Sequence, residues 1–362
     1  MKDIRMILPN PASDTAGAAS TLFQLNGLTI IHDAAGSMES YITFDESREL
    51  EGKRTVASRL SRLEAITGDD SILLNKIETE CADNPPPFVA ILGSPVPFTI
   101  GTDLDGIAAE AEFSTGIPSF AVNTGGFALY DKGAGEALQK VLEKTAHPPE
   151  PHEGRIVNLL GATPMDYSPA EIEDIRQQLL ADGAAQVRSL TMTDGMDEVY
   201  HATEADHNLV ISVAGLPAAR YLKQKYGIPY SIGVPFDSSI SITPSAPQKI
   251  LLIGESVFTK QLAQMLSRLP HVEVIAGITS NDDAELFPEV PSVILHTEAD
   301  IRAELRNGYT IVLGDPLYRL LLPQNHNCIF LERPHHALSG RLYPFSEYKL
   351  NHYLNELKRC LT

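Results

Sequence analysis

A series of short apolar runs, each separated from the next by a stretch of helical character, constrains this fold more than any other feature. One helical stretch opens with Ser168-Pro169-Ala170-Glu171, which has the form of a capping box with proline in the first turn. Continuously apolar strands that alternate with helices are typical of parallel sheets covered on both faces. We therefore expect an α/β fold. The expected strands are Leu28–Ile31, Phe88–Leu92, Phe120–Val122, Ile156–Leu160, Leu209–Val213, Ile250–Ile253, Val272–Ile275, Ser292–Leu295, Thr310–Leu313 and Cys328–Leu331.

Two segments far apart in the chain repeat one device, in which glycine ends a helix and Ile-Pro leads into a strand. They are Gly116-Ile117-Pro118 and Gly227-Ile228-Pro229. Glycine takes the left-handed conformation that closes a helix, and proline cannot continue one. The repeat predicts two domains built on one plan. Proline-rich segments at 147–152 and 243–247 divide the 362 residues into three expected domains, at 1–150, 151–246 and 247–362, the last closing with a helix.

The net charge and the hydropathy of the sequence argue against two classes of binding partner, nucleic acids and membranes. The formal charge of −19 argues against nucleic acids and anionic membrane surfaces, because both would repel the average surface. No apolar run approaches the roughly 20 residues that span a bilayer. The apolar stretch within Met1–Pro11 is too short to be the core of a signal peptide. We therefore expect a cytoplasmic protein with no membrane or nucleic-acid partner.

Motifs for common cofactors are missing from the sequence. The three cysteines, Cys81, Cys328 and Cys360, share no C-x-x-C or C-x-x-H spacing, which argues against a zinc site or a self-contained four-cysteine cluster. There is no P-loop and no G-x-S-x-G elbow, and Gly133-Ala134-Gly135 is a weak match to a dinucleotide fingerprint. The residues by themselves assign no catalytic group.

Several segments, taken in order, resemble the nitrogenase component 1-type oxidoreductases. The turn His32-Asp33-Ala34-Ala35-Gly36-Ser37 follows the first apolar run, where that family places a cluster cysteine at the last position. A second segment resembles the family's C-P-x-x-x-I-G-D-D-I turn, and a third resembles its P-V-x-C-x-G-F. The segments that carry the likeness are Arg62–Asp70, Ser94–Leu104, Ile117–Phe127, Asn158–Gly161, Asn208–Ser212, Gly227–Pro229 and Leu331–Gly340.

The resemblance implies three Rossmann-like domains around a central cleft. It also implies pairing with a homologous subunit, as a homodimer or a heteromer, and an iron–sulfur cluster near the dimer face of the first domain. A separate ATP-dependent iron protein would deliver the electrons.

Carried over position by position, the family's three cluster cysteines fall on residues that are not cysteine. The first falls on Ser37, the second on Pro95 or beside it at Ser94, and the third on Thr124. Hydroxyl groups are harder and more basic than thiolates, so they are poor iron–sulfur ligands. We therefore expect no metal held by this chain alone. Asp33 or Ser37 remains a candidate oxygen ligand to a cluster held mainly by a cysteine-bearing partner, and the alternative is that Ser37 and Thr124 cap the helices that follow them.

The family's active-site cofactor maps to a different part of the chain. Its anchoring cysteine falls close to Ser212, and its histidine ligand falls on His335 or His336. The sequence leaves open which of the two histidines faces the cleft.

Two functions follow, and the first is the one the resemblance implies. In it, the chain is an oxidoreductase subunit that accepts electrons through a partner's iron–sulfur cluster and reduces a small molecule or tetrapyrrole in the cleft. In the alternative, the same cleft holds a metallocofactor, a tetrapyrrole or another anion without catalysis, bound by backbone N–H groups at strand ends such as Gly125. A third interpretation, an unrelated multi-Rossmann enzyme, is disfavoured by the order of the matching segments.

Overall fold

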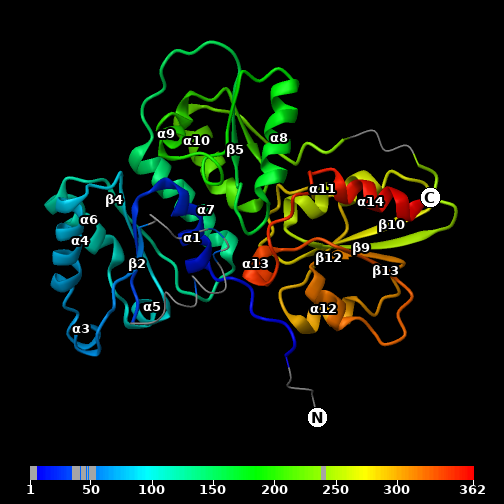
Figure 1. The fold of residues 1–362 in the computed structure, drawn as a ribbon, viewed down its shortest axis with the longest axis horizontal. Helices are drawn as coiled ribbons and strands as arrows, with labels where there is room; N and C mark the ends of the chain where they lie inside the picture. Colours follow the sequence, from blue (N-terminus) through cyan, green and yellow to red (C-terminus); the bar gives the residue numbers. More distant parts are fainter. Residues whose placement is uncertain (1–5, 35–40, 42–45, 47, 49–53, 238–241) are drawn as a thin grey trace.

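Three parallel β-sheets organise the computed structural model, which describes residues 6–34, 41, 46, 48, 54–237 and 242–362 (Figure 1). The first sheet has the order β2-β1-β3-β4, and the second has the order β6-β5-β7-β8. The two orders follow one plan, and Ile117-Pro118 and Ile228-Pro229 lead into the last strand of each, as the repeat predicts. The strands are β1 (Leu28–Ile31), β2 (Thr55–Ala57), β3 (Val89–Leu92), β4 (Ser119–Val122), β5 (Ile156–Leu160), β6 (Gln186–Arg188), β7 (His207–Val210) and β8 (Tyr230–Ile232).

The third sheet is larger and has the order β11-β10-β9-β12-β13. All pairings in the three sheets are parallel, which confirms the expected fold class. The domain boundaries near residues 150 and 246 fall between the sheets and stay a prediction. The strands of this sheet are β9 (Gln248–Gly254), β10 (Val272–Ile278), β11 (Ser292–Ile294), β12 (Ile311–Gly314) and β13 (Ile329–Glu332).

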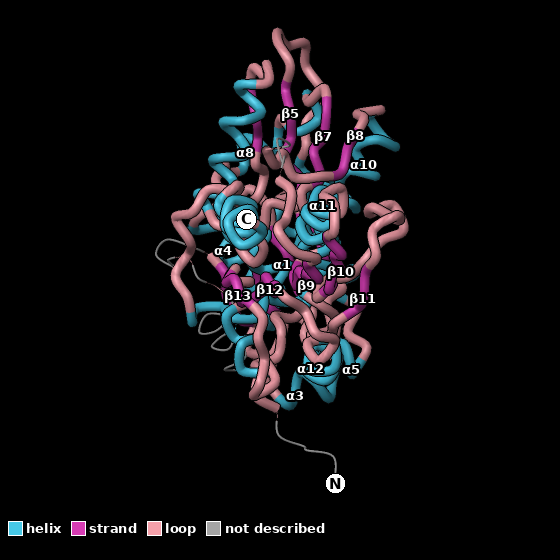
Figure 2. Tube along the Cα trace, turned by 90° about the vertical axis from the view of Figure 1, so that its right-hand side faces the viewer, coloured by secondary structure: helices cyan, strands magenta, loops and turns pink. Residues whose placement is uncertain are grey.

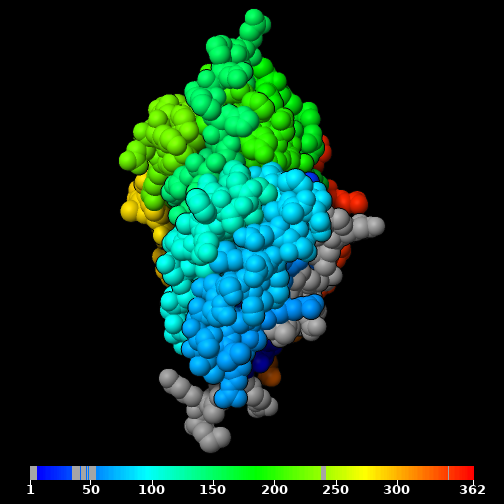
Figure 3. Space-filling model, turned by 90° about the vertical axis from the view of Figure 1, so that its left-hand side faces the viewer, coloured from blue at the N-terminus to red at the C-terminus, as the bar shows by residue number. Residues whose placement is uncertain are grey.

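Helices cover both faces of the sheets, as continuously apolar strands require. On the first sheet, α4 and α6 lie on one face and α1 and α7 on the other; the outer helices form the blue and cyan surface of Figure 3. In Figures 1 and 2, α11 lies between the second sheet and strands β9 and β10. The helices are α1 (Asp14–Leu22), α3 (Arg62–Thr67), α4 (Ser71–Asp83), α5 (Pro95–Ile100), α6 (Leu104–Thr115), α7 (Tyr130–Thr145), α8 (Pro169–Ala181), α9 (Met196–Tyr200), α10 (Leu216–Tyr226), α11 (Ser256–Leu266), α12 (Glu298–Glu304), α13 (His336–Ser339) and α14 (His352–Leu361).

Helices α1 and α7 touch backbone to backbone near the centre of the molecule. A Cβ atom on Gly17 would lie 1.9 Å from the carbonyl oxygen of Tyr130, and one on Gly133 would lie 1.8 Å from the carbonyl oxygen of Asp14. Only glycine permits this approach. The contact fixes the first residue of α7, Tyr130, against the first turn of α1.

One continuous apolar core joins the three sheets. It includes Leu92 from β3, Leu160 from β5 and Leu252 from β9, and it extends to Leu354 and Leu361 of the closing helix α14. The leucines of α14 therefore pack against the body of the protein, as their helical spacing predicts. Within the described part of the chain, no helix is both long enough and apolar enough to cross a membrane.

Candidate functional site

Three buried polar side chains meet where the three sheets adjoin, and each comes from a different sheet. Tyr130 begins α7 after β4, Asp166 lies in the loop after β5, and His335 precedes α13 after β13. Loops at the carboxyl ends of parallel strands are where open α/β sheets place ligands. The meeting point is therefore the place in this fold where a site is expected.

The three side chains form a closed hydrogen-bonded group. The Tyr130 hydroxyl donates to Oδ1 of Asp166, and Nε2 of His335 lies 3.1 Å from the same oxygen and 3.2 Å from the phenol oxygen. Oδ2 of Asp166 accepts a bond of 3.0 Å from the Thr163 hydroxyl. Both oxygens of the Asp166 carboxyl group are thus occupied, and the group is held in one orientation.

A buried arginine supports this group from behind. The guanidinium of Arg333 donates to the backbone carbonyl of Asp166 at 2.8 Å and lies 3.4 Å from Oε1 of Glu171. Its central carbon is 3.7 Å from the centre of the Phe258 ring, which is within the range of a cation–π contact. Arg333 therefore fixes the loop that carries Asp166.

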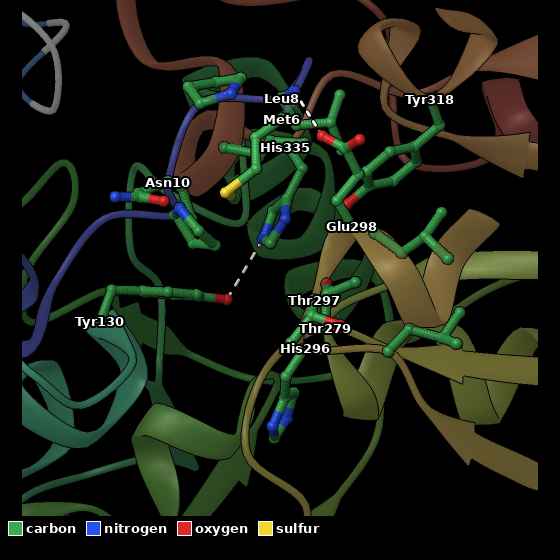
Figure 4. A pocket seen from close by; sticks show the side chains of 16 residues that line it. Met6, Leu8, Asn10, Tyr130, Thr279, His296, Thr297, Glu298, Tyr318 and His335 are labelled. Atoms are coloured by element: carbon green, nitrogen blue, oxygen red, sulfur yellow. Dashed lines mark hydrogen bonds between the residues drawn. The ribbon is translucent and has the colours of Figure 1, made fainter. Parts of the chain in front are cut away.

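A cavity of about 180 Å³ opens beside Tyr130 and His335. Figure 4 shows these two side chains pointing toward each other at the cavity, with Tyr318 and Glu298 across from them. The lining residues are Met6, Leu8, Pro9, Asn10, Pro11, Tyr130, Thr279, Leu295, His296, Thr297, Glu298, Ile301, Tyr318, His335, Ala337 and Leu338.

The N-terminal segment forms one wall of the cavity. The backbone N–H groups of Ile7 and Leu8 donate to Oε2 of Glu298 at 2.6 and 2.8 Å, and Ala12 donates to the carbonyl of Ala337 at 2.6 Å. Oε1 of Glu298 accepts from Arg302 on the next turn of α12. Segment 6–12 is therefore fastened to α12 through Glu298 and to α13 through Ala337.

Tyr130 is a poor proton donor in this setting. Burial, followed by the negative charges of Asp166, Asp131 and Glu255, raises the pKa of Tyr130 well above its ordinary value. The phenol therefore stays neutral and acts as a hydrogen-bonding group.

The described residues that the sequence expects at the cluster position, Asp33, Ser94 and Thr124, follow the carboxyl ends of β1, β3 and β4. The Ser94 hydroxyl donates to the carbonyl of His32 at 2.9 Å, and the Thr124 hydroxyl donates to the carbonyl of Gly93 at 2.7 Å. Thr124 does not cap the following helix, because α7 has Leu129 at its N-cap position. The Asp33 carboxylate accepts from the Ala34 amide, and Ser37 lies outside the described residues.

The amide of Gly125 already has an internal partner. The carboxylate of Asp14, at the start of α1, accepts bonds of 2.9 Å from Gly125 and 2.7 Å from Gly126. Asp14 is buried and comes from another element. The backbone donors of Gly125 and Gly126 are thus occupied by a side chain of the same protein.

Ser212 and His335 do not line one cavity. The Ser212 hydroxyl is fully buried and donates to the carbonyl of Gly161 at 2.7 Å. The amide of the next residue, Val213, donates to Oε1 of Glu255 at 2.8 Å. Only His335 of the two lines the cavity.

The structure also distinguishes the two adjacent histidines. His335 faces Tyr130, whereas Nδ1 of His336 lies 3.0 Å from the carbonyl of Gly340, away from the cavity lining. Burial lowers the pKa of His336.

The described donor atoms do not fit an iron–sulfur cluster held by this chain. Ser94 and Thr124 give their hydroxyl hydrogens to backbone carbonyls, and Pro95 begins α5. Cys81 packs in the apolar core under the first sheet, and burial raises the pKa of its thiol, as it does for Cys328 and Cys360. In the part of the chain that the structure describes, no three His, Cys, Asp or Glu side chains are grouped to hold a metal ion.

Comparison with known proteins decides the family. Residues 13–239 match the model of the nitrogenase component 1 type oxidoreductases. The chain belongs to this family. A curated member, the nitrogenase iron-molybdenum cofactor biosynthesis protein NifE of Bradyrhizobium diazoefficiens, is 26% identical over 227 residues, and the match covers 57% of this chain and 40% of NifE. The chain therefore spans less than half the length of that relative.

Two solved structures of nitrogenase Cp1 share the fold. A structure titled nitrogenase Cp1 at pH 6.5 superposes with a TM-score of 0.73 at 13% identity, covering 98% of this chain and 89% of that one. A second, nitrogenase Cp1 at pH 5, gives a TM-score of 0.57 at 15% identity, covering 93% and 78%. At these identities the likeness establishes the fold alone.

Sequence reasoning did not find Tyr130, Asp166 or Asp14. Asp166 and Tyr130 both follow expected strands, at Ile156–Leu160 and Phe120–Val122, so their position after a strand was the available signal. Their convergence depends on how three sheets sit together, and no spacing within one segment encodes that.

Proposed function

We propose that this component 1 family member is a ligand-binding subunit, and that its ligand occupies the cavity beside Tyr130 and His335. The observation that carries the proposal is the cavity itself. It lies beside the buried group of Tyr130, Asp166 and His335, and two of its polar wall residues, Tyr130 and His335, belong to that hydrogen-bonded group. Preformed polar groups in a largely apolar pocket are typical of small-molecule sites.

The size of the cavity favours a small ligand. Drug-sized ligands occupy pockets of roughly 300–1,000 Å³, whereas this cavity measures about 180 Å³. A tetrapyrrole or a metallocluster would enter only if segment 6–12 released its contacts with Glu298 and Ala337.

The reductase interpretation is the second candidate, and family membership supports it. In it, a homologous partner subunit holds the iron–sulfur cluster, an ATP-dependent iron protein supplies electrons, and this chain provides the substrate cavity. The hydroxyl groups of Ser94 and Thr124, at the positions of the family's cluster ligands, donate to backbone carbonyls and are not arranged as ligands to a partner's cluster. Binding without chemistry on this chain is therefore the better-supported proposal.

Purification under anaerobic conditions from the native host separates the two candidates. The bound iron, the co-purifying chains and the small molecules released on unfolding would be measured on one preparation. A released small molecule from iron-free protein supports binding alone. Iron together with a cysteine-bearing companion chain supports the reductase.

A cavity-filling variant tests the site. Ala337→Leu adds three carbon atoms to a buried wall residue, and Ala303→Leu makes the same change on the exposed face of α12. We expect the released small molecule to be lost from the first variant and retained by the second. Retention by both, with native melting temperatures, would place the ligand elsewhere.

A further inference from the structure

We infer that the ligand of this cavity is a small uncharged molecule, mostly apolar, that carries one hydrogen-bond donor. The inference rests on the proposed function and adds the chemical class of the ligand. It departs from the anionic ligand that the sequence suggests, and it depends on which charges face the cavity and how each is already paired.

Apolar side chains form most of the wall. Leu8, Leu295, Ile301, Ala337 and Leu338 all line the cavity, and each is buried or nearly so. An apolar cavity of about 150 Å³ in another protein accommodates benzene, so about 180 Å³ admits a ring with one small substituent. Contact with these walls would supply most of the binding free energy.

An anion would find no free positive charge here. Among the lining residues that the structure describes, none is lysine or arginine. The two histidines of the lining already face protein oxygens, since Nε2 of His335 lies 3.1 Å from Oδ1 of Asp166 and Nε2 of His296 lies 2.9 Å from the Ser280 carbonyl oxygen. The guanidinium of Arg333 is the closest support to the buried group, and it faces Glu171 and the Asp166 carbonyl. Moving an unpaired carboxylate or phosphate into such a space costs several kcal/mol or more.

A cation would also lack a free partner. Glu298 is the one carboxylate in the described lining, and its two oxygens accept from the Ile7 and Leu8 amides and from Arg302. Behind the wall, Asp166 has both oxygens bonded as well. A bound ammonium group would have to break one of these contacts, so neither sign of charge is favoured.

The Tyr130 oxygen is a polar handle of the cavity, and it acts as an acceptor. Tyr130 gives its hydroxyl hydrogen to Asp166, and Nε2 of His335 lies 3.2 Å from the phenol oxygen, so one of its two lone pairs is left for a ligand. A ligand O–H or N–H group that reached this oxygen would satisfy it without disturbing the Asp166 carboxyl. This is why the inferred ligand carries a donor.

Four probes of nearly equal size test the charge class: toluene, benzyl alcohol, benzylamine and benzoate. Binding to the full chain would be measured by calorimetry at pH 7 in about 0.15 M salt, where long-range attraction to the acidic surface is screened. We expect benzyl alcohol to bind at least tenfold more tightly than benzylamine or benzoate. Equal or tighter binding of either ion would overturn the inference.

A matched pair of variants tests the handle. Tyr130→Phe removes the phenol oxygen, and we expect the affinity for benzyl alcohol to fall to that for toluene. Tyr167→Phe is the control, because Tyr167 is equally buried and donates to the Ile211 carbonyl at 2.6 Å without lining the cavity. If Tyr130→Phe does not fold, the ratio of benzyl alcohol to toluene affinity in the wild type remains as the test, and a ratio near one contradicts the handle.

Failure of the inference can be told apart from failure of the proposed function. If none of the four probes binds, or if Ala337→Leu leaves their binding unchanged, the cavity is not the ligand site. If Ala337→Leu abolishes binding but the wild type prefers one of the ions, the cavity remains the site and only the uncharged character of the ligand is rejected.

Discussion

Asp14 holds the loop after β4 in place, and removing its carboxylate should cost more than an ordinary helix cap. The carboxylate accepts from the amides of Gly125 and Gly126, and Oδ1 also accepts from the Thr15 amide at 3.0 Å. Asp14→Ala would leave the Gly125 amide buried without a partner, since this residue is itself buried.

The size of the effect follows from the two bonds that cross between elements. Hydrogen bonds to charged groups contribute about 1.5–3 kcal/mol each. Water can reach the half-buried Gly126 once the carboxylate is gone, which reduces its share. We therefore expect Asp14→Ala to lower the free energy of unfolding by about 3 kcal/mol, and Asp14→Asn, which keeps one acceptor, by about half as much.

Urea unfolding and amide hydrogen exchange at Gly125 and Gly126 would measure this effect. Asp103→Ala is the control, because Asp103 caps α6 through a single bond of 2.9 Å to the Gly106 amide and should cost about 1 kcal/mol. If Asp14→Ala cost no more than Asp103→Ala and left exchange at Gly125 unchanged, the structural role given to Asp14 would be wrong.

Three further predictions concern the core of the molecule. Gly17→Ala should destabilise the protein by about 3 kcal/mol or more in urea, whereas Gly195→Ala, whose Cβ would meet nothing within 4 Å, should be nearly neutral. Burial, with the charge of Asp166, raises the pKa of Glu255 to about 8, so the folded state keeps a proton that the unfolded chain loses near 4.5. The free energy of unfolding should therefore fall as pH rises from about 4.5 to about 8, and Glu255→Gln should flatten this slope in urea midpoints measured across that range. Arg333→Met should lower stability by about 3–5 kcal/mol in thermal unfolding, because it leaves a buried carboxylate unpaired, and Arg333→Lys should not restore it.

Most of the fold could be predicted from the sequence, because apolar runs and helix punctuation are local signals. The strands without such a signal were β2 (Thr55–Ala57) and β6 (Gln186–Arg188), which are three residues long and lie at sheet edges. An edge strand has one neighbour and needs little apolar sequence. Gly133-Ala134-Gly135, a weak nucleotide motif by its letters, serves the close contact between α1 and α7 at Gly133.

The sequence pointed to one residue that lines the cavity, and it did so through the family resemblance. His335 was expected at a cleft, and it does line the cavity. The sequence could not choose it over His336, because the choice depends on how the chain turns into α13. Tyr130 and Asp166 lie in no shared motif, and only the arrangement of the three sheets brings them together.

After a strand of each of the three sheets, a carboxyl group of the protein itself accepts from the backbone amides that could otherwise bind an external anion. Asp14 occupies the amides after β4, Glu255 occupies the amide of Val213 after β7, and Asp315 accepts from the amide of His335 after β13 at 2.8 Å. Each carboxyl group comes from an element other than the loop it binds, so each bond also fastens two segments together. Backbone donors at strand ends are the positions where this fold would otherwise hold an anion. Because these donors are filled, the cavity beside Tyr130 offers an added molecule side chains in place of backbone donors, and these side chains select for a ligand without charge.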